Sequence, residues 1–391
     1  MTSKPVLENA HPGPFGLHGK STPVGEAVTV DRAFVERLIR LSLRGLEKMY
    51  HPEDQLLYSV DFENGSRETV RHLGKRYTVM SALGIYEARA AGYTTFLDGK
   101  DLLREGLRSF EGEDIDHLAM ALWADCTIDS GLGDELISRL AAALEDGHEK
   151  HIGRVLAWGL TAIALHAERD PEGPTKALAE TLFGFAKTQC WREKGGLFAH
   201  RGEGGPGFVR NMALFSTQIY WVYAFATFGR VFQNDEAIRI ATRCADTLIS
   251  LRDPCAGWPW RYDAARGRVT ERYPVYSVHQ DAMAPMALHA LQDATGTSFA
   301  QVNQESMGWL YRNELGLPMV DDEEDIIFRA IRRRFPLNRM AYQTGWATAF
   351  CGLTSPMREK PWFLRLNATC RPYHLGWVLH AWCGREDRIG A

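Results

Sequence analysis

Residues 257–291 read GWPWRYDAARGRVTERYPVYSVHQDAMAPMALHAL, in which a loop rich in arginine and aromatic residues runs directly into an apolar helix. The loop contains Trp258, Trp260, Tyr273 and Tyr276, whose rings are suited to stacking on a ligand. The helix that follows is apolar around most of its circumference, as expected of a helix buried on all sides. The stretch therefore predicts an inner helix whose entrance is a ligand-binding loop.

The same helical spacing recurs from this stretch towards both ends of the chain. Apolar residues at i, i+3, i+4 and i+7 dominate, and the period-two alternation of strands is nearly absent. With Asp, Ser and Gly as start and stop signals, the spacing predicts twelve helices. Those with charged residues along one face are expected to be outer helices: 31–49, 99–110, 133–146, 174–189, 235–251 and 298–313. Those that are apolar or small-sided all round are expected to be inner helices: 77–91, 117–129, 153–168, 213–229, 277–294 and 372–384.

Six outer-inner hairpins, repeating roughly every 50 residues, predict an all-α fold: a single (α/α)6 toroid. Four connections are long, polar and rich in arginine and aromatic residues: 50–76, 190–212, 252–276 and 314–370. Each of them leads from an outer helix to an inner helix, so all four should meet at one end of the toroid. That end is the predicted location of the functional site.

The toroid domain is expected to span 31–391. Residues 1–30 contain Pro and Gly but no apolar segment of the secretory type, and they are predicted to be a disordered leader. Segment 314–370 is too long for an ordinary loop, so it is an insertion before the last inner helix. Its acidic start and arginine-rich continuation predict a short helix over 321–335, with another near 342–352.

The charge balance and the cysteines argue against several classes of protein. Lys and Arg number 45 against 49 Asp and Glu, and the formal net charge of -4 argues against nucleic-acid binding. No apolar run reaches the length of a membrane helix, so no membrane span is predicted. The seven cysteines are odd in number and scattered, which favours reduced thiols and a cytoplasmic protein. No cofactor and no metal site are predicted.

Two inner-helix entrances carry the strongest candidate site residues. In the first, Asp281 is a candidate general acid or base with His279 as its partner, because the unpaired N–H groups of a helix start suit anions and carboxylates. In the second, Arg371, Tyr373 and His374 could clamp a ring by stacking and hydrogen bonding. A structural interpretation stays open for both: a first-turn acid in one, and packing of the last inner helix in the other.

Other candidates lie in the remaining long connections. Asp61 and Glu63 could provide a second carboxyl group, which glycoside hydrolysis ordinarily requires. Arg210 and Asn211 close a glycine-rich stretch that could act as a lid or rim. These four residues would complete a site built around the two entrances.

Arginines concentrate in the long connections although the whole chain is acidic. A mouth lined by arginine attracts carboxylates and phosphates through bidentate contacts. We therefore expect a small anionic substrate: a uronate, a sugar phosphate or a prenyl diphosphate. In the alternative interpretation, the arginines pair with acidic residues of the same loops.

The hairpin rhythm, together with the aromatic-rich entrances YPVYSVHQDAMAPM and CRPYHLGWVLHAW, resembles the six-hairpin toroid superfamily. That superfamily contains glycoside hydrolases, polysaccharide lyases and sugar epimerases, and its substrates lie in the mouth formed by the loops that lead into inner helices. The resemblance implies a carbohydrate-active enzyme that cleaves or isomerises an anionic sugar or oligosaccharide by acid-base chemistry. Asp281 would exchange the proton, the aromatic residues of 257–291 would stack on sugar rings, and Arg210 and Arg371 would hold the negative group.

A second resemblance gives an alternative function. Asp114-Ile-Asp116-His117, before an inner helix, is similar to the Asp-x-Asp-Asp motif of class II terpenoid cyclases, although its fourth position is His. It implies an isoprenoid cyclase in which Asp116 donates the proton and aromatic residues stabilise carbocations. A closed apolar cavity reaching Asp116 would favour the cyclase, and polar groups along an open groove would favour a sugar. A third interpretation is a non-catalytic binding protein, because no unmistakable catalytic motif is present.

Overall fold

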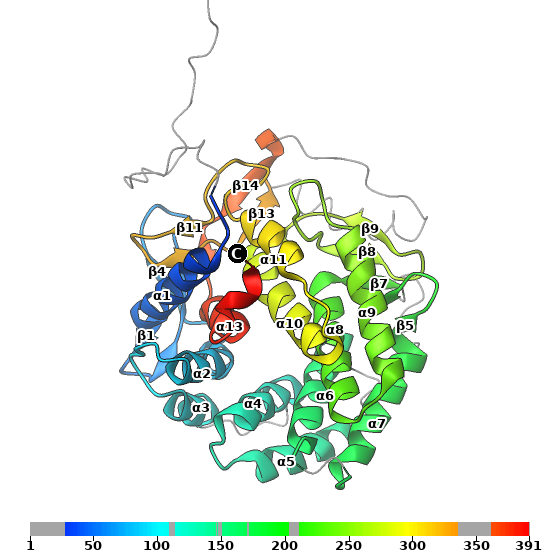
Figure 1. Cartoon of the computed structure of the whole chain (residues 1–391). Coiled ribbons are helices and arrows are strands. Elements are labelled where there is room, and N and C mark those ends of the chain that lie inside the picture. The colour runs from blue at the N-terminus through cyan, green and yellow to red at the C-terminus, as the bar shows by residue number, and fades with distance from the viewer. Residues whose placement is uncertain are drawn as a thin grey trace, which may run out of the picture.

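The computed structural model describes residues 28–108, 114–145, 147, 151–169, 172–202, 211–334 and 361–390. Within these ranges, outer and inner helices alternate along the chain, and short strands lie in the connections between them (Figure 1). The order of the elements follows the predicted hairpin rhythm.

The helices occur where the apolar spacing predicts them, with boundaries that differ by a few residues. The outer helices are α1 (Arg32–Met49), α3 (Gly99–Leu107), α5 (Gly133–Glu145), α7 (Thr175–Phe185), α9 (Asp235–Ser250) and α11 (Ala300–Gly308). The inner helices are α2 (Gly74–Ala90), α4 (Ile115–Ile128), α6 (Gly153–Ala167), α8 (Phe215–Val231), α10 (Ala284–Thr295) and α13 (Pro372–Trp382). A π-helical turn, η2 (Ala186–Cys190), continues α7, and another, η3 (His279–Met283), precedes α10. Short 3-10 turns are η4 (Pro361–Phe363) and η5 (Glu386–Ile389).

The inner helices form a closed ring, which Figure 1 views along its axis. Helix α2 packs against α4, α4 against α6, α6 against α8 and α8 against α10, while α13 closes the ring between α10 and α2. Outer helices flank them, with α3 on α2, α5 on α4, α7 on α6 and α9 on α8. The predicted single (α/α)6 toroid is confirmed.

Local sequence signals explain where the outer helices begin and how closely the inner helices pack. Asp31 caps α1 by accepting a hydrogen bond from the backbone N–H of Phe34 at 2.9 Å. Asn234 caps α9 in the same way. Between α2 and α13, a Cβ atom on Gly84 would clash with the backbone of Gly376, so glycine permits this approach.

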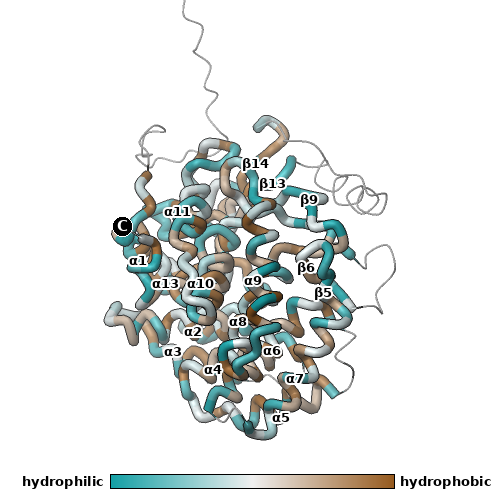
Figure 2. Tube along the Cα trace, turned by 45° about the vertical axis from the view of Figure 1, so that its right-hand side comes forward, coloured by the Kyte–Doolittle hydropathy of each residue, from teal (hydrophilic) through white to brown (hydrophobic). Residues whose placement is uncertain are grey.

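Fifteen short antiparallel strands lie in the outer-to-inner connections of the described chain. They are β1 (Tyr50–His51), β2 (Leu56–Leu57), β3 (Ser59–Asp61), β4 (Glu68–Val70), β5 (Trp191–Arg192), β6 (Leu197–Phe198), β7 (Met212–Leu214), β8 (Arg261–Asp263), β9 (Arg268–Glu271), β10 (Val275–Tyr276), β11 (Val320–Asp321), β12 (Ile326–Ile327), β13 (Ala330–Arg333), β14 (Leu364–Asn367) and β15 (Thr369–Cys370). The three-stranded sheets have the orders β15-β3-β4, β7-β8-β9 and β10-β13-β14. Figure 2 shows several of these strands gathered at one end of the toroid. The all-α prediction omitted them because strands this short carry no readable alternation.

The predicted helix over 321–335 is wrong. Residues 320–333 instead form the hairpin β11-β12 and then β13. Its acidic residues pair with basic side chains of α1: Asp322 with Arg37, and Asp325 with Arg44 at 2.7 Å. The acids are therefore neutralised by an outer helix and not by the dipole of a helix of their own.

Two of the predicted segments lie wholly or largely outside the residues that the structure describes. Residues 1–27 of the predicted leader and the stretch 342–352 lie outside the described residues, whereas Val30 is buried against the core. Of the helices that the structure describes, none is long and apolar enough to cross a membrane. No disulfide joins the cysteines of the described ranges.

Candidate functional site

A cavity of about 390 Å³ lies where the inner helices begin. Its walls come from the entrances of α2, α6, α8 and α13, from η3 and β10, and from the loops that hold Trp260 and Arg329. Arginines, aromatic residues and one histidine dominate the lining, and no carboxylate belongs to it among the described residues. The cavity therefore lies at the end of the toroid that the long connections predicted.

Four arginines line the cavity, and for three of them the described residues provide no acidic partner. Arg76 pairs with Asp116 at 2.5 Å. In the described ranges, no ion pair is formed by Arg154, Arg329 or Arg371. Positive charges without a counterion in a concave, partly desolvated site attract an anion. The cavity is thus prepared for a negatively charged ligand.

Aromatic rings hold these arginines and form the rest of the wall. Each of the three lies over a ring, with the guanidinium carbon 4.8–5.8 Å from the ring centroid: Arg154 over Trp158, Arg329 over Tyr276 and Arg371 over Tyr77. Tyr77 also lies 5.3 Å from Tyr373, and Trp158 lies 5.3 Å from Tyr220, between ring centroids. Cation-π contacts of this kind orient a guanidinium group without neutralising it.

His279 is the histidine of the lining and begins the π turn η3. Its ring centroid lies 4.5 Å from that of Phe215 and 5.0 Å from that of Tyr276. Burial, followed by the charges of His374 and Arg329, lowers the pKa of His279 to about 3. Its Nδ1 atom is buried without a hydrogen-bond partner. A neutral imidazole in this position can accept a hydrogen bond from a bound ligand.

Asp281 is fully buried and contacts His374 instead of the cavity. The Nε2 atom of His374 lies 2.9 Å from both carboxylate oxygens. Pro285 lacks the N–H that would bond to the carbonyl of Asp281 in an α-helix, and the indole N–H of Trp382 donates to that carbonyl at 2.7 Å. Burial raises the pKa of Asp281, and the contact with His374 opposes this rise. The missing N–H of Pro285 is therefore accommodated by the π turn η3, which carries Asp281 of the Asp281–His374 pair.

Asp116 reaches the cavity lining through Arg76. It lies in the first turn of α4, and 12% of its side chain is exposed. Burial and the neighbouring carboxyl group of Asp114 raise the pKa of Asp116 to about 6, although Arg76 and Arg154 oppose the rise. Near neutral pH this carboxyl group exists in both forms, as a general acid requires.

The structure brings five of the predicted residues together in the cavity: Trp260, Tyr276, His279, Arg371 and Tyr373. The backbone carbonyl of Trp260 accepts a hydrogen bond from Phe215 N at 3.0 Å, which joins the loop to the start of α8. Pro372 stands at the start of α13, where its missing N–H is no loss, and Arg371 is the N-cap residue of the helix. The two entrances singled out in the sequence therefore share one cavity.

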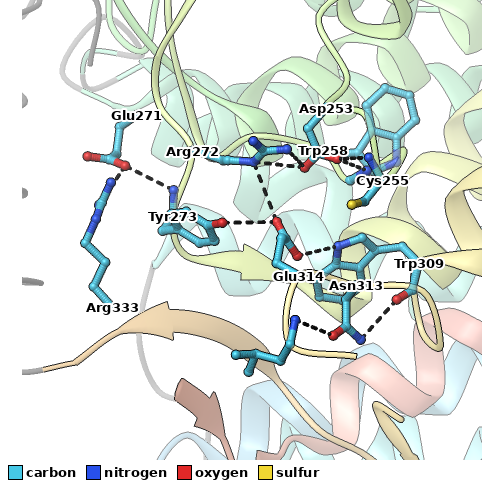
Figure 3. Close-up of polar contacts among 12 residues, drawn as sticks. Asp253, Cys255, Trp258, Glu271, Arg272, Tyr273, Trp309, Asn313, Glu314 and Arg333 are labelled. Carbon is cyan, nitrogen blue, oxygen red and sulfur yellow. Dashed lines mark hydrogen bonds and ion pairs between the residues drawn. The ribbon is translucent and has the colours of Figure 1, made fainter. Parts of the chain in front are cut away.

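Trp258 and Tyr273 are not part of the lining. Both are buried in the region of a polar network that joins the connection 252–276 to α11 and the loop after it (Figure 3). The hydroxyl group of Tyr273 donates to Glu314 at 3.2 Å, and the indole N–H of Trp258 donates to Ser306 at 2.7 Å. Their polar atoms are engaged in holding the loop.

The carboxylates predicted as second catalytic groups also lie outside the lining. Asp61 pairs with Thr369 across β3 and β15, and its Oδ1 accepts a hydrogen bond from Glu63 N at 2.7 Å. The side chain of Glu63 forms ion pairs with Arg332 at 2.5 Å and Arg365 at 3.4 Å. Both carboxylates therefore have structural neighbours in the strands of the rim.

The two candidates from the glycine-rich stretch, Arg210 and Asn211, are not part of the described cavity lining. Asn211 accepts a hydrogen bond from Arg192 at 3.1 Å and does not line the cavity. Arg210 lies outside the described residues. Several rim arginines pair with acids of nearby loops, as the alternative interpretation expected: Arg71 with Asp54, Arg266 with Asp263, and Arg272 with Asp253.

Three residues of the lining were not predicted from the sequence: Arg154, Arg329 and Tyr220. Arg154 was detectable, because it is the one charged residue near the start of the apolar inner helix 153–168. Arg329 was hidden by the wrong helix prediction, and Tyr220 by its position inside an inner helix that was assigned to the core. A charge at the entrance of an otherwise apolar helix is therefore a useful signal in this fold.

Comparison with solved structures identifies the fold. Similar structures include a sugar epimerase from a ruminal bacterium, with a TM-score of 0.60 and 10% identity over 90% of this chain and 99% of that one. A possible member of the GH105 family from Salmonella enterica has a TM-score of 0.60 and 9% identity over 93% and 96% of the two chains. The unsaturated glucuronyl hydrolase of Bacillus sp. GL1 has a TM-score of 0.57 and 14% identity over 89% and 94%.

These likenesses extend over nearly the whole of each chain. The six-hairpin glycosidase-like toroid inferred from the hairpin rhythm is therefore confirmed as the fold. The sequence matches no protein-family model and no curated protein. At identities this low, the comparison establishes architecture, and function must be argued from the cavity.

Proposed function

We propose that this protein is an enzyme that binds an anionic sugar or oligosaccharide in the mouth of the toroid and acts on it by acid-base chemistry. One observation carries the proposal: three arginines without acidic partners in the described chain line an aromatic-walled cavity at the inner-helix entrances. Arginine binds carboxylates and phosphates with two parallel hydrogen bonds, and aromatic faces pack on sugar rings.

Each group of the lining has a role in this proposal. Arg154, Arg329 and Arg371 hold the negative group, while Trp260 and Tyr373 pack against the sugar. A uronate fits this description, because it combines one carboxylate with a ring. Similar folds named as unsaturated glucuronyl hydrolases and as a sugar epimerase support carbohydrate chemistry.

Two groups with shifted pKa values contribute to the proposed chemistry. We assign His279 as a hydrogen-bond acceptor for a substrate hydroxyl group, because it lines the cavity and its lowered pKa keeps it neutral at physiological pH. We assign Asp116 as a proton donor because its raised pKa of about 6 keeps part of the population protonated. Asp281 is fully buried, so we assign it to positioning through His374 and not to proton exchange with the substrate.

The lining also bears on the alternatives. A terpenoid cyclase would need an apolar cavity, but four arginines line the observed one. A non-catalytic binding protein would need only the arginines and the rings. The shifted pKa values of His279 and Asp116 at the cavity favour an enzyme, because such shifts cluster at catalytic sites.

The test is isothermal titration calorimetry with glucuronate, galacturonate, glucose 6-phosphate and geranylgeranyl diphosphate. We expect uronate binding that Arg371→Gln weakens about 10- to 100-fold, as loss of a charged hydrogen-bond donor predicts. Arg71→Gln is the matched control, because Arg71 belongs to the same rim but is exposed and paired with Glu53 and Asp54. Binding of the prenyl diphosphate alone, or binding that Arg371→Gln does not change, would contradict the proposal.

Turnover is tested separately with the ligands that bind. Incubation in D₂O followed by NMR detects both cleavage and exchange of a carbon-bound proton. We expect turnover that Asp116→Asn abolishes and His279→Gln lowers while binding persists. Tight binding without any chemical change in oligosaccharides of the same uronate would instead indicate a binding protein.

A further inference from the structure

Strands β13 and β14 place two arginines directly opposite each other. The register pairs Arg332 with Arg365 in the sheet β10-β13-β14. Like charges at directly opposed positions destabilise an antiparallel pair. This arrangement opposes stability, and a bound anion would relieve the repulsion between the two guanidinium groups.

A single carboxylate bridges the two arginines. Glu63 contacts Arg332 through Oε1 at 2.5 Å and Arg365 through Oε2 at 3.4 Å. The Nε atoms of both arginines are buried without a hydrogen-bond partner, and no second carboxylate of the described chain forms an ion pair with either. The cluster therefore keeps one net positive charge and unused donors, since each guanidinium group has five N–H bonds.

Strand geometry places this cluster on the cavity side of the sheet. Tyr276 lines the cavity and pairs with Ala330, and Arg332 is two residues further along β13. Residues opposite each other, and residues two apart, share one face of a sheet. The other face carries buried residues, including Ile331 and Arg333. Arg332 and Arg365 thus follow Tyr276 on one face, at a distance of about 7 Å along the strand.

We propose that Arg332 and Arg365, bridged by Glu63, form a second anion-binding subsite beside the cavity, so that the substrate is an oligosaccharide with negative groups on two neighbouring sugars. The inference rests on the proposed function, because the cavity binds the first anionic sugar. Glu63 is a positioning residue in this arrangement: it holds the two guanidinium groups together without neutralising both.

The rim continues in the same direction with aromatic surface. Trp362 and Phe363 stand just before β14, and they are 63% and 41% exposed. They follow Arg365 on the side away from Tyr276, since β14 runs antiparallel to β13. Exposed rings beyond a basic pair suit further sugar units of an extended chain.

The experiment compares ligands that differ by one charge. Wild-type protein is titrated calorimetrically with galacturonate, with 4-linked digalacturonate, and with digalacturonate methyl-esterified at its reducing-end carboxylate. We expect the free diacid to bind at least about tenfold more tightly than its monoester, a gain of ~1.4 kcal/mol. Arg365→Gln should remove this gain and leave galacturonate affinity unchanged, whereas Arg371→Gln should weaken all three ligands.

Arg67→Gln is the matched control, because Arg67 is a partly buried arginine of the same rim that is paired with Glu324. Glu63→Gln leaves the two positive charges unbridged, so the preference for the diacid should persist or increase in that variant. Circular dichroism and melting temperature report whether each variant is folded.

The outcomes separate the two proposals. Equal affinity of diacid and monoester, with galacturonate still dependent on Arg371, would overturn the second subsite and leave the proposed function standing. If no uronate binds in a manner that depends on Arg371, the proposed function fails as well. A preference for the diacid that survives Arg365→Gln and Arg332→Gln would also overturn the subsite.

Discussion

Arginines occupy two contrasting settings in this protein. In the network of Figure 3, Arg333 pairs with Glu271 at 2.7 Å and Arg272 pairs with Asp253 at 2.5 Å, and these side chains are mostly buried. In the cavity, the arginines at 154, 329 and 371 rest on aromatic rings and have no carboxylate partner in the described chain. A paired arginine contributes to the fold, whereas an unpaired arginine in a cavity leaves its charge for a ligand.

Loss of a buried ion pair should have the largest effect, and this effect should be on the free energy of unfolding. Glu271→Gln leaves Arg333 charged and buried, with only 4% of its side chain exposed. Removal of one partner of a buried ion pair costs about 3–5 kcal/mol. Urea unfolding should show this loss, and Arg333→Met in the Glu271→Gln background should recover part of it. A loss too small to measure would show that the pairing is not structurally important.

Substitution of an unpaired cavity arginine should affect ligand binding and not folding. Arg329→Gln removes a cavity charge that has no counterion among the described residues, so the free energy of unfolding should stay constant or rise. Uronate affinity should fall by about 1.5–3 kcal/mol, the range for hydrogen bonds to charged groups. Calorimetry and urea unfolding on the same samples check both parts. A stability loss as large as that of Glu271→Gln would erase the contrast.

The titration of Asp116 should change the stability of the protein with pH, by less than the loss of the Glu271–Arg333 ion pair does. Burial raises its pKa to about 6, above the unfolded value of about 3.9, so ionisation is penalised only in the folded protein. The wild type should therefore lose stability relative to Asp116→Asn as pH rises from about 4 to about 6, and the difference should stay constant above that. Melting curves across this range measure it. Parallel curves for the two proteins would refute the raised pKa.

The same group should shape the activity profile. If protonated Asp116 donates the proton, kcat should fall about tenfold per pH unit above about 6. The Asp116→Asn variant should lack this limb, and the neutral His279 should add none above pH 5, because its pKa is about 3. A profile that is flat between pH 5 and 8 would remove Asp116 from the reaction.

Substitution of an exposed, paired arginine of the rim should have the smallest effect on stability and binding. Arg71 pairs with Glu53 and Asp54 in solvent, where side-chain entropy and water offset most of the attraction. Arg71→Gln should leave melting temperature and uronate affinity unchanged within error. A clear loss of affinity would mean that the anion-binding surface extends beyond the cavity on that side.

Helical periodicity was sufficient to predict the toroid, because the distribution of polar and apolar residues around each helix indicates which of its faces are buried. An outer helix such as α1 has one polar face, and an inner helix such as α8 is apolar all round. The strands of the rim were missed because two to four residues contain too little pattern. The run at 321–325 was misread because its partner, α1, is almost 300 residues away in the sequence.

The candidate site was predicted in part. Trp260, Tyr276, His279, Arg371 and Tyr373 were recognised by residue type at helix entrances, and they line one cavity. Trp258 and Tyr273 carry the same signal in the same loop but lie in a buried network, where Ser306 and Glu314 bind their polar atoms. Residue type alone does not indicate which way a side chain in a loop points.

The sequence by itself determined the alternation of helices, the closed toroid and the end at which the long connections meet, since these follow from local periodicity and segment length. Only the tertiary structure decided which arginines keep a free charge and which carboxylates are already engaged. Glu63 and Asp116 look alike in the sequence, but one bridges two arginines and the other has a pKa raised by burial. Pairing and desolvation depend on neighbours brought together by folding, and local sequence does not encode those neighbours.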